Sequence, residues 1–193
     1  MSLEGAGGIG GEVIADVPRG EDAILVGVQS ALTGRPGVLA GARVLSYFGE
    51  HSLGWFAVCG LGALLQPQRR RAWVTAGVGT FFAHAAAVLI KRVVKRERPQ
   101  HPAIAVNVGT PSRLSFPSAH ATSTTAAAIL IGRATGLPLP WFLVPPMALS
   151  RLVLGVHYPS DVLTGVVVGT VVAESVGAVS DRSAKARAAG VKA

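Results

Sequence analysis

Three short clusters of polar residues interrupt an otherwise apolar chain, and their residue types are those of a phosphate-transfer site. Such a reaction needs cations for the phosphoryl oxygens, an in-line nucleophile and an acid for the leaving oxygen. The clusters hold Lys91 and Arg98, then Ser118 and His120, and finally Arg151, His157 and Asp161. Each lies at the edge of a hydrophobic run, where charged groups can meet water and a lipid headgroup together.

The two histidines can divide the chemistry between a nucleophile and a general acid. Asp161 follows His157 by four residues. A carboxylate bonded to one imidazole nitrogen leaves the other nitrogen free to attack phosphorus. His120 follows Ser118, a residue suited to capping a helix, so we expect it in a first helical turn as the acid.

Two simpler interpretations compete with this one. Taken singly, a histidine at a helix edge is more often a surface group, and Lys91 or Arg98 would be an interfacial cation. His120, His157 and Asp161 could instead bind zinc. The convergence of all the clusters argues against the first interpretation, and three nearby cations argue against the second. We therefore expect neither a metal nor a cofactor.

The composition indicates a membrane protein. The chain has 193 residues, of which 50% are hydrophobic and 15% charged, whereas soluble domains average about 25% charged residues. Residues 73–90 carry no charge, and about 20 apolar residues span a bilayer. The net charge of +8 comes from cations at the ends of hydrophobic runs. This pattern favours contacts with anionic headgroups and not with nucleic acid.

The predicted fold is an all-α, polytopic membrane helix bundle with five or six transmembrane helices and N-terminal interfacial helices. The expected spans are residues 52–65, 73–90, 119–131, 141–156 and 162–179. Counting spans places all three clusters on one membrane face. We expect the second helix to run on to Pro99, so that Lys91 and Arg98 share a helical face.

The chain divides into a flexible tail, one domain and a basic tail. Residues 1–20 are rich in glycine and acidic residues and form the first tail. Residues 21–180 form a single membrane-embedded domain, within which residues 21–48 are expected to lie at the interface. Residues 181–193 form the basic C-terminal tail.

The three clusters together resemble the signature of the type 2 phosphatidic acid phosphatase superfamily, which are integral membrane lipid phosphatases. The resemblance covers roughly residues 73–179, with Ala119 where the family usually has glycine. It implies metal-independent hydrolysis through a phosphohistidine at His157, which Asp161 orients, with His120 as the acid. It also implies a phosphate clamp of Lys91, Arg98, Ser118 and Arg151.

Within that family, segments 48–52, 100–116 and 115–125 look similar to actinobacterial members. Those enzymes remove the sugar 5-phosphate of decaprenyl-phosphoryl-phosphoribose in cell-wall synthesis. Alternative substrates are phosphatidylglycerophosphate, phosphatidic acid and a polyprenyl diphosphate. Alternative classes are a lipid phosphotransferase and a non-catalytic lipid-binding or scramblase-like protein.

Further polar residues near the clusters are candidates for the substrate headgroup. Glu50, His51 and Lys95 are expected to contact it. Additional cations attract anionic lipid or bind a second substrate phosphate, namely Arg92, Lys95, Arg96 and Arg113. The expected partners are the lipid phosphate and the phospholipid bilayer. The expected location is the bacterial plasma membrane, with the site facing outward.

Overall fold

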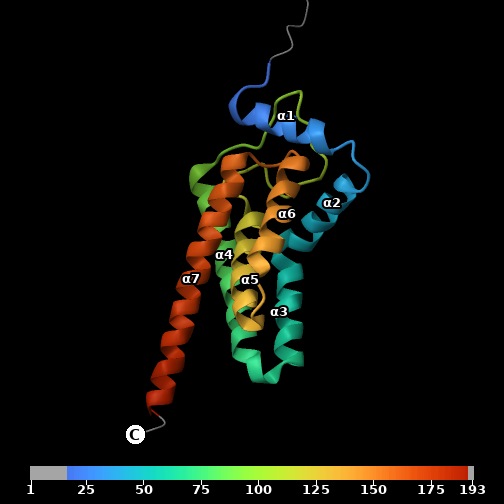
Figure 1. Ribbon diagram of the computed structural model, residues 1–193. Helices are drawn as coiled ribbons and strands as arrows, with labels where there is room; N and C mark the ends of the chain where they lie inside the picture. Colours follow the sequence, from blue (N-terminus) through green and yellow to red (C-terminus); the bar gives the residue numbers. More distant parts are fainter. Residues whose placement is uncertain (1–16, 191–193) are drawn as a thin grey trace, which may run out of the picture.

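The computed structural model describes residues 17–190, which are almost entirely helical (Figure 1). The elements are α1 (Gly20–Leu32), α2 (Val38–Gly49), η1 (Glu50–Ser52), α3 (Leu53–Leu65), η2 (Pro67–Arg69), α4 (Arg70–Val94), α5 (Ala119–Thr135), α6 (Leu139–Val153) and α7 (Pro159–Gly190). This helical content confirms the predicted all-α class. Most of the expected N-terminal tail, residues 1–16, lies outside the described residues.

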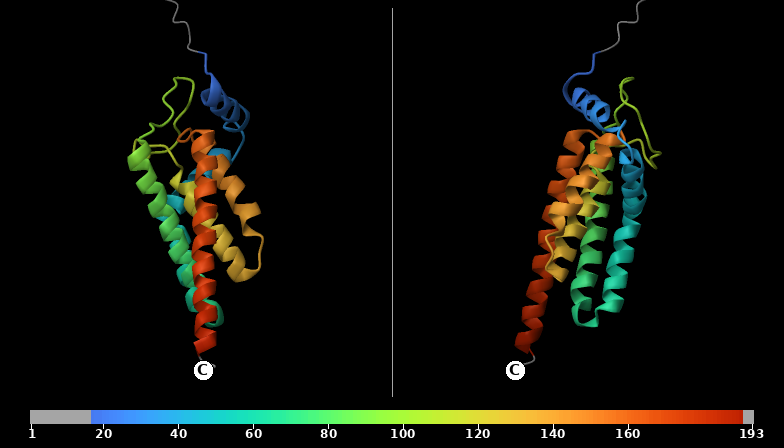
Figure 2. Two further views of the ribbon diagram at one scale, coloured as in Figure 1. Left: turned by 90° about the vertical axis from the view of Figure 1, so that its left-hand side faces the viewer. Right: turned by 45° about the vertical axis from the view of Figure 1, so that its right-hand side comes forward.

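Helices α3 to α7 run alternately up and down, and α1 lies across one end of the bundle (Figures 1 and 2). The ends of α4 and α6 and the starts of α5 and α7 all reach that end, below α1 and the loop of residues 95–118. The predicted placement of the three clusters on one face is therefore confirmed. Helix α1 crosses the end of the bundle, and its location at a membrane surface stays a prediction.

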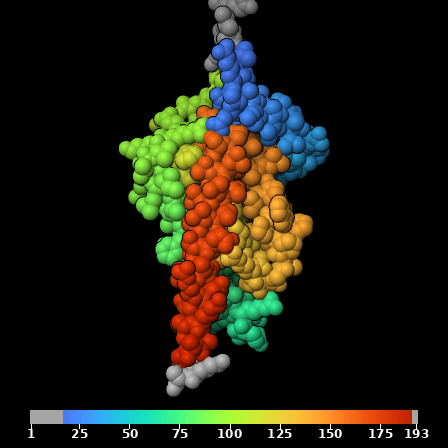
Figure 3. Space-filling view, turned by 60° about the vertical axis from the view of Figure 1, so that its left-hand side comes forward, coloured from blue at the N-terminus to red at the C-terminus, as the bar shows by residue number. Residues whose placement is uncertain are grey.

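Two helices are long and apolar enough to cross a membrane, namely Pro67–Val94 and Pro159–Gly190. Helices α3, α5 and α6 have 13, 17 and 15 residues, fewer than the roughly 20 that span a bilayer unaided. Figure 3 shows α7 along the surface beside α6. Its outer side carries large apolar residues, among them Leu163, Val167 and Val171, as a lipid-facing surface would.

The central helix α5 is built from small residues, which lets its neighbours approach closely. Most of α5 is buried, and it packs against α4, α6 and α7. A Cβ at Gly165 of α7 would lie 2.8 Å from the carbonyl oxygen of Ser118. In addition, the backbone N–H of Ser118 donates to the carbonyl oxygen of Asp161 at 2.9 Å. The starts of α5 and α7 are thus fixed against each other.

The expectation that α4 continues to Pro99 is wrong. The helix ends at Val94, and Lys95 takes a left-handed conformation with φ of 54°. Arg98 follows in an extended segment, where its N–H donates to the carbonyl oxygen of Arg113 at 3.2 Å. Pairing with the loop satisfies backbone groups that the helix would otherwise have used. Lys91 and Arg98 therefore come from different elements and share no helical face.

Helix α7 continues to Gly190, through residues assigned to the basic C-terminal tail. Residues 191–193 lie outside the described part of the chain. No proline or glycine interrupts residues 178–189, so nothing in the local sequence ends the helix earlier. The tail as a separate unit stays a prediction.

Candidate active site

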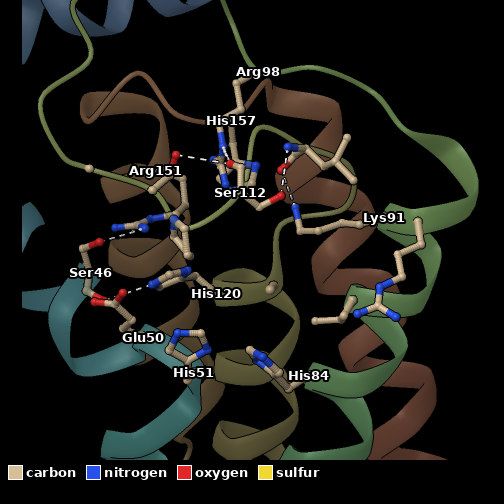
Figure 4. A pocket seen from close by; sticks show the side chains of 17 residues that line it. Ser46, Glu50, His51, His84, Lys91, Arg98, Ser112, His120, Arg151 and His157 are labelled. Carbon is tan, nitrogen blue, oxygen red and sulfur yellow. Dashed lines mark hydrogen bonds between the residues drawn. The ribbon is translucent and has the colours of Figure 1, made fainter.

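A cavity of about 290 Å³ lies at the α1 end of the bundle (Figure 4). Its walls come from α2, η1, α4, α5, α6 and the loops before α5 and α7. Seven of the predicted site residues line it: Glu50, His51, Lys91, Arg98, His120, Arg151 and His157. Segments far apart in the sequence therefore meet around one space, as the three clusters predict.

The imidazole of His157 is almost fully buried, with 2% of its surface exposed. A guanidinium nitrogen of Arg98 (Nη1) lies 3.2 Å from Nε2 of His157. Because a guanidinium only donates hydrogen bonds, Nε2 must be the acceptor and the ring proton must sit on Nδ1. That nitrogen lies 3.5 Å from Oδ2 of Asp161, slightly beyond hydrogen-bond length. The unprotonated Nε2 thus faces the cations of the cavity.

The surroundings of His157 keep it neutral. Burial, and then the charges of Arg98, Lys91 and Arg151, lower the pKa of His157 well below 6.5. Burial also lowers the pKa of Arg98 to about 10, so Arg98 remains charged at neutral pH. A neutral imidazole beside fixed cations has a free electron pair for attack on phosphorus.

Arg151 presents a free donor at the cavity. The residue is 2% exposed, and its Nη1 donates to Oγ of Ser46 at 3.2 Å. Its Nη2 is buried and has no hydrogen-bond partner among residues 17–190. A buried, unpaired guanidinium N–H is costly, and a bound anion would relieve that cost. Glu50 is the one acidic side chain lining this cavity within the same residues.

Ser118 and His120 begin α5 as predicted. Ser118 is the N-cap, and its Oγ accepts from the N–H of Ala121 at 3.4 Å. The side chain does not line the cavity, but the following Ala119 does, which brings the helix N-terminus to the anion site. His120 has Nε2 at 2.9 Å from the carbonyl oxygen of Ser46. A carbonyl only accepts, so the His120 proton lies on Nε2.

Asp161 lies behind His157 and outside the cavity. It is fully buried, and its Oδ2 accepts the N–H of Tyr158 at 2.8 Å. Its Oδ1 accepts from Arg96 at 3.1 Å. The interpretation of Arg96 as a cation for lipid or a second phosphate is therefore wrong, because it is bound to Asp161 and Glu21. Lys95 is exposed and does not line the cavity.

Four polar lining residues were not assigned to the site from sequence: Ser46, His84, Thr110 and Ser112. One of them carries a usable signal, since His84 precedes Lys91 by seven residues and so shares its helical face. Its Nδ1 lies 3.0 Å from Oγ of Ser52. Ser46 lies in α2, remote in sequence from every cluster, and no motif marks it.

The sequence of this chain matches a known family and two curated proteins. Residues 72–182 match the model of the PAP2 superfamily. The chain is 73% identical to the decaprenylphosphoryl-5-phosphoribose phosphatase of Mycolicibacterium smegmatis over 152 residues, which cover 79% of this chain and 84% of that one. It is 66% identical to the Mycobacterium tuberculosis protein of the same name over 170 residues, covering 88% of this chain and 96% of the other.

A solved structure shows the same fold. The transmembrane PAP2-type phosphatidylglycerolphosphate phosphatase of Bacillus subtilis superposes with a TM-score of 0.65 at 18% identity, covering 83% of this chain and 86% of that one. Together with the sequence matches, it confirms the predicted phosphatase class and its membrane-protein fold. The chain belongs to the PAP2 superfamily.

Proposed function

We propose that this chain removes the sugar 5-phosphate of a polyprenyl-phosphoryl pentose, as the names of its mycobacterial relatives state for them. The observation that carries the proposal is the pairing of a neutral, buried His157 with the unpartnered N–H of Arg151 at one cavity. The first supplies a nucleophile and the second a donor for the phosphoryl oxygens. Lys91 and Arg98 complete the cation set.

The reaction proceeds in two steps at His157. In the first, Nε2 attacks phosphorus, the bond from phosphorus to the sugar oxygen breaks, and His120 gives that oxygen a proton. In the second, water attacks the phosphohistidine, the P–N bond breaks and the water proton returns to His120. Because Nε2–H of His120 faces Ser46 in this structure, Nδ1 must take up a proton before the transfer, so that an imidazolium is the acid.

The rest of the cavity suits a sugar carrying a second phosphate. Below the cations, its wall carries the carboxylate of Glu50 and the imidazoles of His51 and His84 (Figure 4). These groups exchange hydrogen bonds with hydroxyls. Arg92 also lines the cavity and is placed to pair with the diester phosphate. At about 290 Å³, the cavity takes a headgroup and leaves a polyprenyl tail in the lipid.

Lys95, although exposed, remains a proposed contact at the outer edge of the headgroup. It stands at the end of α4, four residues after the buried Lys91. A flexible cation there can reach a phosphate at the membrane surface.

The bundle is proposed to span the bacterial plasma membrane with helices α3 to α7, while α1 and α2 lie at its surface. Local thinning of the bilayer accommodates the shorter helices. Arg69, Arg70, Arg71 and Arg133 gather at the end away from the cavity. Under the positive-inside rule these four arginines favour a cytoplasmic location for that end, and this supports a cavity that faces outward.

Orientation is tested by cysteine labelling in intact cells. Cys59 is the single cysteine of the chain and is first replaced, as Cys59→Ala. Gln100→Cys then reports the cavity end and Gln68→Cys the opposite end, since both positions are exposed. An impermeant maleimide should label only the first. Labelling of the second alone would reverse the orientation.

Substrate preference is tested by phosphate release from a panel of lipids in the presence of chelator. The panel holds decaprenyl-phosphoryl-ribose 5-phosphate, phosphatidic acid, phosphatidylglycerophosphate and decaprenyl diphosphate. The pentose lipid should have the highest kcat/KM. Glu50→Gln should raise the KM for that lipid and leave the KM for phosphatidic acid unchanged. A preference for any other panel member would overturn the substrate assignment.

A further inference from the structure

A hydrogen-bonded network behind the active site joins Asp161 to the surface helix α1. Arg96 occupies its centre and donates from Nη1 to Oδ1 of Asp161 at 3.1 Å and to Oγ of Ser160 at 2.6 Å. Its Nη2 donates to Oε2 of Glu21 at 2.6 Å. Its guanidinium carbon lies 4.1 Å from the ring centre of Tyr158. Three polar partners and the ring of Tyr158 thus hold the planar fork of Arg96.

Glu21 also holds the start of the helix that carries Asp161. Its Oε1 accepts the N–H of Ser160 at 2.8 Å, and its Oε2 accepts the hydroxyl of Ser160 at 3.0 Å. The N–H groups in the first turn of a helix have no partner within the helix. A carboxylate at that position supplies one and interacts favourably with the helix dipole. Helix α1 therefore caps α7 from outside.

The contacts divide the two oxygens of Asp161 between different tasks. Arg96 binds Oδ1, while Oδ2 accepts from Tyr158 and lies 3.5 Å from Nδ1 of His157. A fully buried carboxylate needs a paired charge to stay ionised, and Arg96 supplies that charge without occupying Oδ2. Arg96 does not line the cavity, so it can act on a substrate only through Asp161 and His157.

We propose that Arg96 and Glu21 are positioning residues, which keep Asp161 ionised with Oδ2 directed at Nδ1 of His157 and thereby make α1 part of the catalytic apparatus. The inference rests on the proposed role of His157 as the nucleophile. The family match begins at residue 72, so Glu21 lies outside it. Such outer partners typically change activity about 10- to 100-fold when replaced in metal sites, and we expect a similar range here.

The test measures kcat and KM separately for Arg96→Gln, Arg96→Lys and Glu21→Gln, on whichever panel lipid the wild type turns over fastest. Arg96→Gln should lower kcat about 10- to 100-fold and leave KM within about twofold, because only an interaction outside the binding cavity is lost. The kcat of Arg96→Lys should lie between those of the wild type and Arg96→Gln, because lysine keeps the positive charge but lacks the planar fork of hydrogen-bond donors. Glu21→Gln should lower kcat by a smaller factor.

The pH profile separates positioning from a purely structural role. Arg96, Lys91 and Arg98 are the cations facing Asp161 from α4 and the loop after it, and His157 and Tyr158 face it from the α7 side. With Arg96→Gln, Asp161 takes up a proton more easily and then no longer orients His157. The acid limb of kcat should therefore move to higher pH, and Arg96→Lys should restore it.

Glu174→Gln is the matched control, because Arg133–Glu174 is also a 2.6 Å ion pair but lies at the other end of the bundle. It should leave kcat and the pH profile unchanged.

Wild-type kcat and pH profile in Arg96→Gln would overturn the inference. If that variant fails to fold, the same result in both Arg96→Lys and Glu21→Gln overturns it. Activity in His157→Ala would instead refute the proposed role of His157 as the nucleophile. If His157→Ala is inactive and Arg96→Gln is unaffected, only the role of Arg96 and Glu21 is refuted.

Discussion

Residues 72–182 and the N-terminal helices α1 and α2 contribute to the cavity in different ways. The first region, which matches the PAP2 superfamily, supplies the side chains at the anion site, including Arg98, Arg151 and His157. The N-terminal helices supply groups that hold those side chains. Ser46 bonds Arg151 and His120, and Glu21 bonds Arg96. The reactive groups thus lie in one continuous region, while two of the residues that support them, Ser46 and Glu21, come from outside it.

The largest effect should follow removal of the nucleophile in the matched region. His157→Ala should lower kcat at least about 1,000-fold, because the variant lacks the nitrogen assigned to attack phosphorus. The purified variant should still unfold cooperatively on heating. Phosphate release and thermal unfolding are measured on the same preparation, and release at the wild-type rate would refute the assignment.

Arg151→Met tests whether Arg151 serves catalysis and not the stability of the fold. The variant should lose about 100-fold in kcat/KM, the typical cost of removing one donor to a transition-state oxygen. Its unfolding temperature should stay equal or rise, because an apolar side chain of similar length replaces a buried charge with an unpaired N–H. A large fall in unfolding temperature would show that Arg151 supports the fold.

The pH dependence of kcat/KM reports the protonation of His157. Since burial and nearby cations lower its pKa well below 6.5, the free enzyme keeps a neutral nucleophile at pH 6.5 and below. The acid limb should therefore fall below pH 6.5. The same shift in pKa makes stability depend on pH. The unfolded chain binds a proton at His157 near pH 6.5 and the folded chain does not, so the free energy of unfolding falls as the pH drops below that value. An acid limb above pH 6.5 would contradict a neutral His157.

The smallest effect should follow a change in the N-terminal region. Ser46→Ala removes one hydrogen bond to Arg151 and leaves the backbone carbonyl that binds His120. A hydrogen bond of this kind contributes about 1 kcal/mol, or roughly fivefold in kcat/KM. Ser175→Ala in α7 is the control, because its exposed hydroxyl bonds only a carbonyl of its own helix. Equal kcat/KM in both variants would mean that α2 does not support the site.

The sequence predicts the motif-bearing parts of this molecule well for a physical reason. Charged residues within apolar runs are costly in a membrane and are kept where they function, so Lys91, His120 and His157 stand out. Span counting then places them together. Ser118 is also predictable as a cap, because the preference for serine at an N-cap is local.

The residues that hold the site from behind, such as Glu21 and Arg96, could not be predicted, because their roles depend on contacts between distant segments. Glu21 lies 139 residues from Ser160, and nothing near either residue in the sequence indicates the pairing. The end of α4 is another case: helix propensity continues past Val94, but pairing of the chain with the loop near Arg113 overrides it. Arg96 was misread because an unpaired and a paired arginine look alike in sequence.

The most direct test of the account is rapid quenching of the first turnover with substrate labelled at its sugar phosphate. The wild-type protein should carry an acid-labile, base-stable label on His157 before inorganic phosphate accumulates, and His157→Ala should carry none. Turnover without any protein-bound label, or a label on another residue, would contradict attack by His157.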